Sequence, residues 1–382
     1  MSEAPRLASP ERVCWVAREK RHESYQQEHR PHMQPGREES RMADVISRRT
    51  IVSFAVAVVA MPTARAADVT ERREVARRLA EVVRREYQDP ASAESMANAI
   101  GARLSSGAYD TALSDDAFAA TLTADLRAVT PDPHMAVMAN LDADAPKLSA
   151  DPVYSLRQNY GVQGIRRLGG NVGVIELNFA PHLGFADAIL ERYAAAMALV
   201  RDTRALIVDL RAHIGGEPGT IAYFVSYFFE RAPFVVNRIR YRNKPTVDYH
   251  TVAAPRGPKY GEKRPVFVLT SGRTFSAGEE LAYDLQATGR ARVVGSRTGG
   301  GAHPDQAFDI GRGFGAFIPI GAAVNPITGG NWERVGVKPD SEAESSKALD
   351  VAWRLALEAA RAQAGSADER KSIDQAIAAL PK

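Results

Sequence analysis

The sequence has 382 residues, 45% of them hydrophobic and 25% charged, a globular balance with room for roughly two domains. Its net charge of +3 belongs to residues 1–66, which hold 11 of the 49 basic and 8 of the 46 acidic residues and leave 38 of each kind for the remainder. That neutral remainder argues against nucleic-acid binding, and a single cysteine, Cys14, excludes an internal disulfide framework.

Residues 42–66 have the pattern of a cleavable export signal. Two arginines at 48–49 precede an apolar run over 51–61, and the sequence ARA at 64–66 matches an A-x-A cleavage site. The run is too short to span a bilayer, and the arginines resemble a twin-arginine signal. A buried helix or an uncleaved anchor is the alternative. We expect an exported protein, periplasmic or extracellular, that begins near Ala67 and keeps no stable membrane anchor.

Residues 1–41 lie upstream of that signal. They are polar, mixed in charge and without periodicity, which predicts disorder. Because a signal normally begins near the start of a protein, Met42 is a candidate initiator and residues 1–41 a candidate extension.

Residues 67–148 predict a small N-terminal helical domain. Apolar residues recur at helical spacing over about 70–87, 96–107 and 114–130. Thr70 is a candidate N-cap of the first helix, and acidic residues in the first turn of the third suit the helix dipole.

Residues 149–345 predict an α/β core with buried parallel strands, because short β-branched runs alternate with helical segments. We expect strands over 171–177, 205–211, 265–271 and 291–296, and helices over 186–200, 220–229 and 277–288. A further strand or hairpin is expected over 315–324. Residues 346–382 predict a final helix, to about 364, and a loose polar tail.

The stretch VFVLTSGRTFSAGEELAYDLQATG, residues 266–289, places Ser276 between a buried strand and a helix. A hydroxyl there lies near the positive end of the helix dipole and near free backbone N–H groups. Ser276 is therefore either an ordinary N-cap or a nucleophile.

A second candidate feature is DLRAHIGGEPGT, in which a buried strand ends in Gly215-Gly216. Adjacent glycines let the backbone approach a ligand and present its N–H groups. We interpret them as one half of an oxyanion hole, or else as a plain turn.

A serine nucleophile needs a base. His134 in TPDPHMAV and His303 in GGGAHP are the two candidates we weigh among five histidines of the mature region. Glu333 in NWERVGVKPD is either the acid that orients the imidazole or a surface residue.

Together, ALIVDLRAHIGG, VLTSGRTFSAGEELA, VVGSRTGGGAHP and NWERVGVKPD resemble, in order and spacing, the tail-specific or C-terminal processing serine peptidases. They resemble in particular the branch of interphotoreceptor retinoid-binding protein and the tricorn protease core, as does LTADLRAVTPDPHMAV. The resemblance covers about residues 67–345. It implies a ClpP/crotonase-like α/β core with flanking helices, behind a small N-terminal helical domain.

The resemblance also implies a mechanism, that of a serine peptidase with an acyl-enzyme intermediate. It implies Ser276 as nucleophile, His134 as base and Glu333 as the acidic partner of the base. The oxyanion hole that it implies is formed by the backbone of Gly215, Gly216 and Ala277. His303 stays an alternative base.

The sequence departs from the family pattern in three places. Better-known members use a Ser–Lys dyad, but the corresponding segment 298–302 has no lysine. The tricorn-like site has a serine just before its histidine, where this chain has Pro133. The sequence leaves no room for a PDZ domain between the helical domain and residue 171.

Two other functions stay open at this point. The retinoid-binding relatives imply a non-catalytic protein that binds apolar ligands, and the related crotonase topology implies an acyl-CoA enzyme. We expect peptide or protein substrates, no cofactor and no metal, because the mature histidines are scattered and no metal motif is visible. The natural substrate and the oligomeric state stay undetermined.

Overall fold

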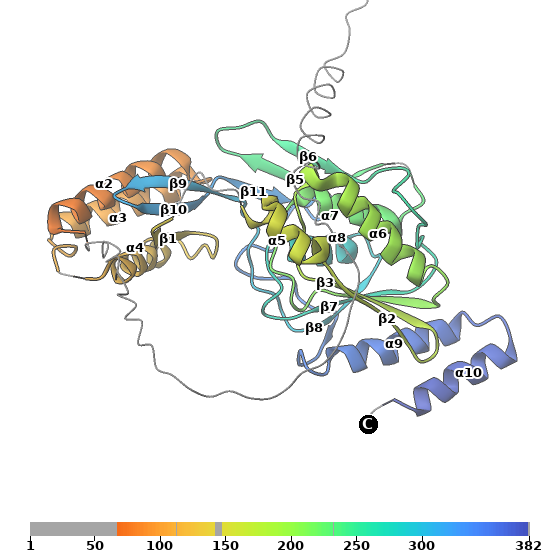
Figure 1. Cartoon of the computed structure of the whole chain (residues 1–382). Helices are drawn as coiled ribbons and strands as arrows, with labels where there is room; N and C mark the ends of the chain where they lie inside the picture. The colour runs from red at the N-terminus through yellow and green to blue at the C-terminus, as the bar shows by residue number, and fades with distance from the viewer. Residues whose placement is uncertain (1–66, 112, 142–146, 232, 381–382) are drawn as a thin grey trace, which may run out of the picture. The chain divides into compact units, whose positions relative to one another are not determined.

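The computed structural model describes residues 67–111, 113–141, 147–231 and 233–380 (Figure 1). The predicted export signal and the extension over 1–41 lie outside the described residues. Within the described ranges, no helix has the length and hydropathy to cross a bilayer.

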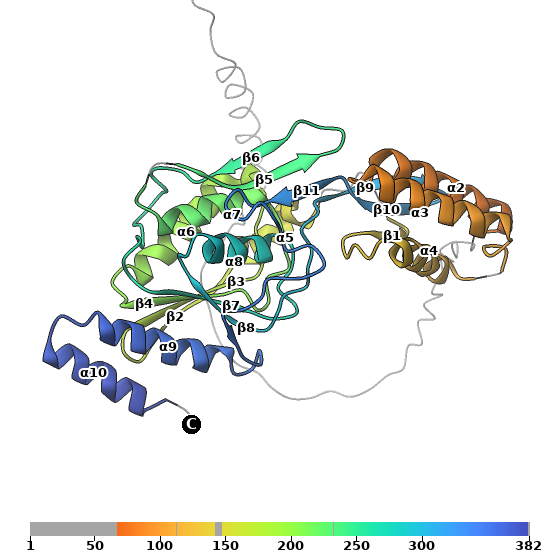
Figure 2. The same cartoon turned by 180° about the vertical axis from the view of Figure 1, so that it is seen from behind.

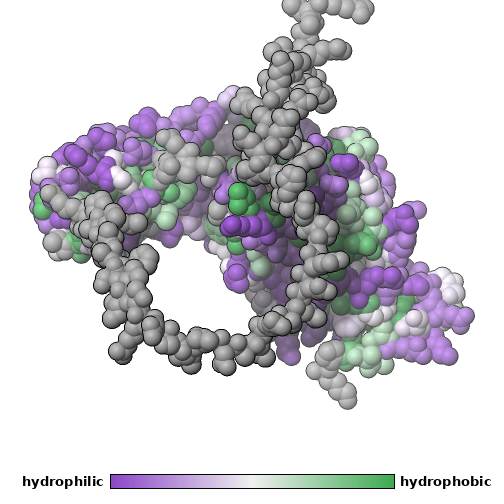
Figure 3. Space-filling view, viewed as in Figure 1, coloured by the Kyte–Doolittle hydropathy of each residue, from purple (hydrophilic) through white to green (hydrophobic). Residues whose placement is uncertain are grey.

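Three helices follow one another at the N-terminal end of the described chain, as predicted. They are α2 (Val69–Glu86), α3 (Pro90–Ser105) and α4 (Asp115–Val129). Each begins after a side-chain cap, and the first cap is Asp68 in a capping box with Glu71, so the expectation of Thr70 was wrong. The surface over these helices is largely hydrophilic in Figure 3, because their apolar faces are buried.

The strand that follows α4, and a hairpin from much later in the chain, pack against these helices. The three strands are β1 (Ala136–Ala139), β9 (Asp305–Gly311) and β10 (Phe314–Pro319), in the antiparallel order β1-β10-β9. Phe314 and Ile318 share one apolar cluster with residues of α2, α3 and α4. His134 lies between α4 and β1, two residues before the strand that pairs with β10, so this pairing holds its backbone near the β9–β10 hairpin.

The central sheet has six strands in the order β12-β8-β7-β4-β3-β2. All neighbours are parallel except β2 and β3. The strands are β2 (Val162–Leu168), β3 (Val172–Leu177), β4 (Ala205–Asp209), β7 (Val266–Thr270), β8 (Arg292–Gly295) and β12 (Ser341–Glu342). β4 and β7 are buried along their whole length, as expected for parallel strands covered on both faces. The predicted parallel α/β core is confirmed.

Helices cover both faces of this sheet (Figure 2). α6, α7 and α8 pack in one apolar cluster with Val208 and Val268, whereas α9 packs on the opposite face against Ile207 and Leu269. Successive strand residues thus point to opposite layers. The helices are α6 (Ala186–Val200), α7 (Pro218–Val225), α8 (Ala277–Ala287) and α9 (Ala348–Ala362).

A third, smaller sheet has the order β11-β5-β6. Its strands are β5 (Val235–Tyr241), β6 (Val247–His250) and β11 (Gly321–Val324). The single strand or hairpin expected over 315–324 is therefore two strands, β10 and β11, which enter different sheets. The remaining short helices are α5 (Pro152–Arg157) and 3-10 turns at Leu148–Ala150, Asn159–Gly161, Leu183–Phe185 and Ser226–Phe228.

The polar tail is not loose where the structure describes it. Residues Ala367–Ala378 form helix α10, capped by Ser366, which packs beside α9. Ile373 is its buried anchor. Ile373, Ala376 and Ile377 lie at helical spacing and pack in the apolar cluster of α9, a pattern that the expectation of a loose tail overlooked.

Candidate active site

Ser276 lies in the connection from β7 to α8 and directly precedes the helix. Its backbone has φ 53° and ψ −121°, whereas ordinary N-cap residues lie in the β region. A non-glycine residue in such a conformation costs about 1–3 kcal/mol and persists only where its surroundings enforce it. Sharp strand-to-helix turns expose the nucleophilic serine of α/β-hydrolases.

Glu279 enforces this conformation from the first turn of α8. Its carboxylate accepts the N–H of Ser276 at 2.9 Å and those of Gly300 and Gly301 at 2.7 and 2.8 Å. It also accepts the hydroxyl of Thr298. Burial raises the pKa of Glu279, and the four hydrogen bonds oppose that effect. Glu279 therefore joins the serine turn to the glycine loop at 299–301.

The Gly215-Gly216 turn lies against the serine. Both glycines have positive φ, 123° and 130°. A Cβ added to Gly215 would lie 2.9 Å from the Cβ of Ser276, and one on Gly216 would lie 1.9 Å from the carbonyl oxygen of Ala180. A side chain at 215 would push the turn away from the serine, and one at 216 would clash with the backbone of Ala180, so glycine is required at both positions.

The two glycine amides differ in what they bind. The Gly215 N–H donates to Nδ1 of His213 at 3.2 Å, so it is already used. Among the described residues, the amides of Gly216 and Ala277 have no acceptor. These two free N–H groups are the ones that can hold an oxyanion.

His213 is a structural residue that the sequence did not single out. It is 1% exposed, and burial lowers its pKa to about 3, so the ring is neutral. Its carbonyl accepts the N–H of Phe275 at 2.9 Å. His213 thus links the glycine turn to the serine turn.

His134 lies against the residue that precedes the serine. Its ring and that of Phe275 have centroids 4.6 Å apart. Both rings occupy the space beside the Cα of Gly301, where an added Cβ would lie 2.5 Å from His134 Cε1 and 2.4 Å from Phe275 Cζ. Burial lowers the pKa of His134, which favours the neutral imidazole that a general base requires.

Glu333 approaches the same cluster on a loop that is paired with the glycine loop. Trp332 Nε1 donates to the Gly301 carbonyl at 2.7 Å, and the Arg334 N–H donates to the Gly300 carbonyl at 2.7 Å. Glu333 Oε2 accepts the Ala302 N–H at 2.7 Å, whereas Oε1 is buried without a partner. Burial raises the pKa of Glu333 to about 7.

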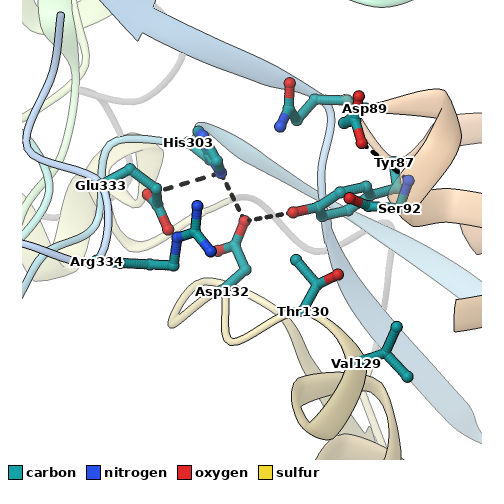
Figure 4. Close-up of a pocket in the computed structure, with 10 residues that line it drawn as sticks. Tyr87, Asp89, Ser92, Val129, Thr130, Asp132, His303, Glu333 and Arg334 are labelled. Carbon is teal, nitrogen blue, oxygen red and sulfur yellow. Dashed lines mark hydrogen bonds and ion pairs between the residues drawn. The ribbon is translucent and has the colours of Figure 1, made fainter. Parts of the chain in front are cut away.

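A hydrogen-bonded chain joins this cluster to the N-terminal helices (Figure 4). Asp132, 1% exposed, accepts the Tyr87 hydroxyl at 3.1 Å and lies 2.6 Å from Nδ1 of His303 through the same oxygen, Oδ2. His303 Nδ1 is also 3.6 Å from Oε2 of Glu333. All of these residues line a pocket of about 270 Å³, together with Gln88, Asp89, Ser92, Val129, Thr130 and Arg334.

The structure brings the predicted catalytic residues together in two groups. Ser276 contacts the glycine turn, and His134, Glu333 and Asp132 form the second group, with one donor atom from each within 4.8 Å of the others. Phe275 and Gly301 join the groups. Among the described residues, no hydrogen bond links the Ser276 hydroxyl to His134 or His303. Asp132 is already engaged by Tyr87 and His303, so we assign no metal to the second group.

Comparison with known proteins decides the family. A model of peptidase family S41 matches residues 171–343, and a model of the N-terminal domain of this peptidase in eukaryotic interphotoreceptor retinoid-binding protein matches residues 66–159. Together the two models cover well over half of the chain. The chain belongs to peptidase family S41. Its substrate class is therefore peptides or proteins, and the predicted resemblance is confirmed.

Solved structures share the fold of this S41 peptidase at low sequence identity. A lipoprotein from Streptococcus agalactiae is 14% identical with a TM-score of 0.51, covering 75% of this chain and 96% of that one. A candidate peptidase from Parabacteroides merdae is 15% identical with a TM-score of 0.53, covering 76% and 97%. These likenesses show a common fold.

Sequence reasoning missed the residues that organise the site, chiefly Asp132, His213 and Glu279. Glu279 carried a local signal, since it has the capping-box spacing of three residues from Ser276. Asp132 carried a weaker signal, because an aspartate two residues before His134 can accept the backbone N–H of that residue. His213 carried none, because only the fold brings it to the serine.

Proposed function

We propose that this S41 peptidase cleaves peptide bonds with Ser276 as nucleophile, His134 as general base and Glu333 as the acid that supports the imidazole. The conformation of Ser276 is the observation that carries the proposal. An ordinary cap has no need of a positive φ, whereas a nucleophile on a sharp turn does.

In the acylation step, His134 takes the proton of the Ser276 hydroxyl as Oγ attacks the carbonyl carbon of the peptide. The resulting oxyanion accepts hydrogen bonds from the N–H groups of Gly216 and Ala277. These fixed donors stabilise its negative charge better than mobile water would. The imidazolium then gives its proton to the leaving amine, the C–N bond breaks, and an acyl-enzyme forms.

In the second step, His134 takes a proton from water, whose oxygen attacks the ester. The tetrahedral intermediate is held by the same amides, and its collapse returns the proton to Ser276 and releases the new carboxyl terminus. Glu333 in its ionised form stabilises the imidazolium in both steps. Gly215 contributes by shape, since its own amide is bound to His213.

The missing Ser276–His134 hydrogen bond is compatible with this mechanism, because catalytic hydrogen bonds in unliganded sites are often long and shorten with substrate. The free buried atoms Nδ1 of His134 and Oε1 of Glu333 support the pairing of these two residues. His303 is the second candidate base, since its Nδ1 is oriented by Asp132 in the way that an acid orients a catalytic imidazole.

The test is labelling with a fluorophosphonate probe. Ser276→Ala is expected to abolish labelling and peptide hydrolysis while the free energy of unfolding changes by no more than about 1–2 kcal/mol, the size of a lost helix cap. Labelling that survives in the variant would remove Ser276 from the mechanism. A wild-type protein that neither labels nor hydrolyses any peptide would favour the ligand-binding alternative.

His134→Ala and His303→Ala separate the two candidate bases. Loss of turnover is expected to be complete in the first variant and partial in the second. Complete loss only in His303→Ala would transfer the role of base to His303.

We also propose that the mature protein is exported, on the strength of the signal pattern at residues 42–66. N-terminal sequencing of protein recovered from the producing cell tests this, with a start near Ala67 expected.

A further inference from the structure

Asp132 makes three contacts that the catalytic proposal does not use. Its Oδ1 accepts the backbone N–H of His134 at 3.0 Å. Its Oδ2 binds both the Tyr87 hydroxyl, from the C-terminal end of α2, and His303 Nδ1, from the loop between β8 and β9. A carboxylate that is 1% exposed and has every oxygen engaged is held rigidly.

His303 lies between two carboxylates. Nδ1 is 2.6 Å from Asp132 Oδ2 and 3.6 Å from Glu333 Oε2. Figure 4 shows the three side chains converging from separate parts of the chain. One ring nitrogen thus connects the acid that fixes the backbone of His134 to the acid proposed to support its imidazole.

We propose that Asp132 and His303 are a positioning pair, which fixes His134 beside the serine turn and sets the charge environment of Glu333. This inference rests on the proposed function, in which His134 and Glu333 take part in catalysis. Neither member of the pair needs to touch the peptide.

Asp132 and His303 have opposite effects on the pKa of Glu333. Burial and, to a smaller extent, the negative charge of Asp132 raise the pKa of Glu333, whereas His303 lowers it, and the resulting pKa is about 7. Arg334 also lowers it, and the other titratable groups close by are His134 and Tyr87. Since Glu333 supports the imidazolium only when ionised, the acid limb of the pH profile follows the pKa of Glu333.

The test is the pH dependence of probe labelling and of peptide turnover in Asp132→Asn and His303→Asn. The first variant removes a negative charge, so its acid limb is expected to move to lower pH. The second removes the imidazole, so its acid limb is expected to move to higher pH. Each shift is on the order of 1 pH unit, as for charges within about 4–6 Å, and kcat should fall more than KM changes.

Two further variants serve as controls. Tyr87→Phe removes a donor to Asp132 and no charge, so it should lower the rate and leave the acid limb in place. Asp89→Asn alters another carboxylate that lines the same pocket, where asparagine can still cap α3. Its profile should match wild type. If Asp132→Asn does not fold, His303→Asn and Tyr87→Phe still test the proposal.

A purely structural pair would lower stability without moving the acid limb, and that result would overturn the inference. So would shifts in the same direction in both charge variants, or complete loss of labelling at every pH in a folded His303→Asn protein, which would make His303 the base. Failure of the proposed function is recognised separately, because Ser276→Ala would then still label.

Discussion

Gly301 lies at the point where the parts of the proposed site meet. The rings of His134 and Phe275 both occupy the space that a side chain at 301 would need. Gly301 also donates to Glu279, and its carbonyl accepts from Trp332. One position therefore contacts the base, the serine turn and the loop of the acid.

We expect Gly301→Ala to displace His134 or Phe275, because the new methyl group would lie about 2.5 Å from both rings. A displacement of about 1 Å can cost on the order of 100-fold in rate, so kcat/KM for a peptide should fall by about that factor. The matched control is Gly272→Ala, where an added Cβ meets nothing within 4 Å. Equal activity in both variants would show that His134 does not need its present place.

Single residues also show what the sequence could and could not predict. Ser276, Gly216 and Ala277 lie in one local strand–turn–helix pattern or at the end of a buried strand, so the periodicity and turn chemistry located them. The engagement of Gly215 by His213, and of Asp132 by His303, depends on distant segments meeting. No local pattern encodes such contacts, because they form only when the chain folds.

At the scale of elements, helix α8 carries the serine at its N-terminus and a buried acidic pair one turn further on. Glu280 and Asp284 are 2% and 1% exposed, and each has one buried oxygen without a partner. Burial raises the pKa of Glu280 to about 8 and also raises that of Asp284. Acidic side chains are seldom fully buried in proteins, but here the tertiary fold buries both.

The buried pair predicts a pH-dependent stability. The pKa of Glu280 is higher in the folded than in the unfolded chain, so its contribution is fully present below the unfolded value and is lost as the pH rises through about 8. The melting temperature of wild type should therefore fall between about pH 5 and pH 8.

Glu280→Gln removes the ionisation and keeps the shape, so its melting temperature should fall less over the same range and exceed that of wild type at pH 8. The control is Glu358→Gln, an exposed position on α9, which should follow wild type. Parallel melting curves for wild type and Glu280→Gln across this range would contradict a buried ionisation at Glu280.

The order of elements was easier to predict than the way they associate. The predicted strands correspond to β3, β4, β7 and β8, because buried parallel strands are short, apolar and β-branched. The β9–β10 hairpin packing on the N-terminal helices was not predicted, since the alternation of apolar residues does not say which surface a hairpin meets. The division into domains at residue 148 stays a prediction.

At the scale of the whole molecule, the proposed site is divided between distant parts of the chain. His134 and Asp132 lie between α4 and β1, whereas Ser276, His303 and Glu333 belong to later connections of the core. The site is complete only when the segment that follows the N-terminal helices packs against these later connections.

Hydrogen bonds connect the C-terminal end of α2 to the β5–β6 turn and to β10. Arg242 Nη1 donates to the Tyr87 carbonyl at 2.8 Å, Asn243 Nδ2 donates to the Arg85 carbonyl at 3.0 Å, and the Gln88 N–H donates to the Pro319 carbonyl at 2.9 Å. The Arg242 bond ends on the residue whose hydroxyl binds Asp132. The position of Tyr87 thus couples the seating of the helices to the proposed site.

We expect Arg242→Ala to lower activity more than stability. A lost hydrogen bond of this kind costs about 0.5–1.5 kcal/mol, too little to unfold the core. Looser seating of Tyr87 would nevertheless release Asp132 and, through it, the backbone of His134. Peptide turnover should fall several-fold relative to Arg240→Ala, the exposed arginine two residues earlier on β5. Amide hydrogen exchange should rise at Asp132, His134 and Met135, the residues of this segment that carry a backbone N–H. Turnover that falls only in proportion to the unfolded fraction would show that the site does not depend on this contact.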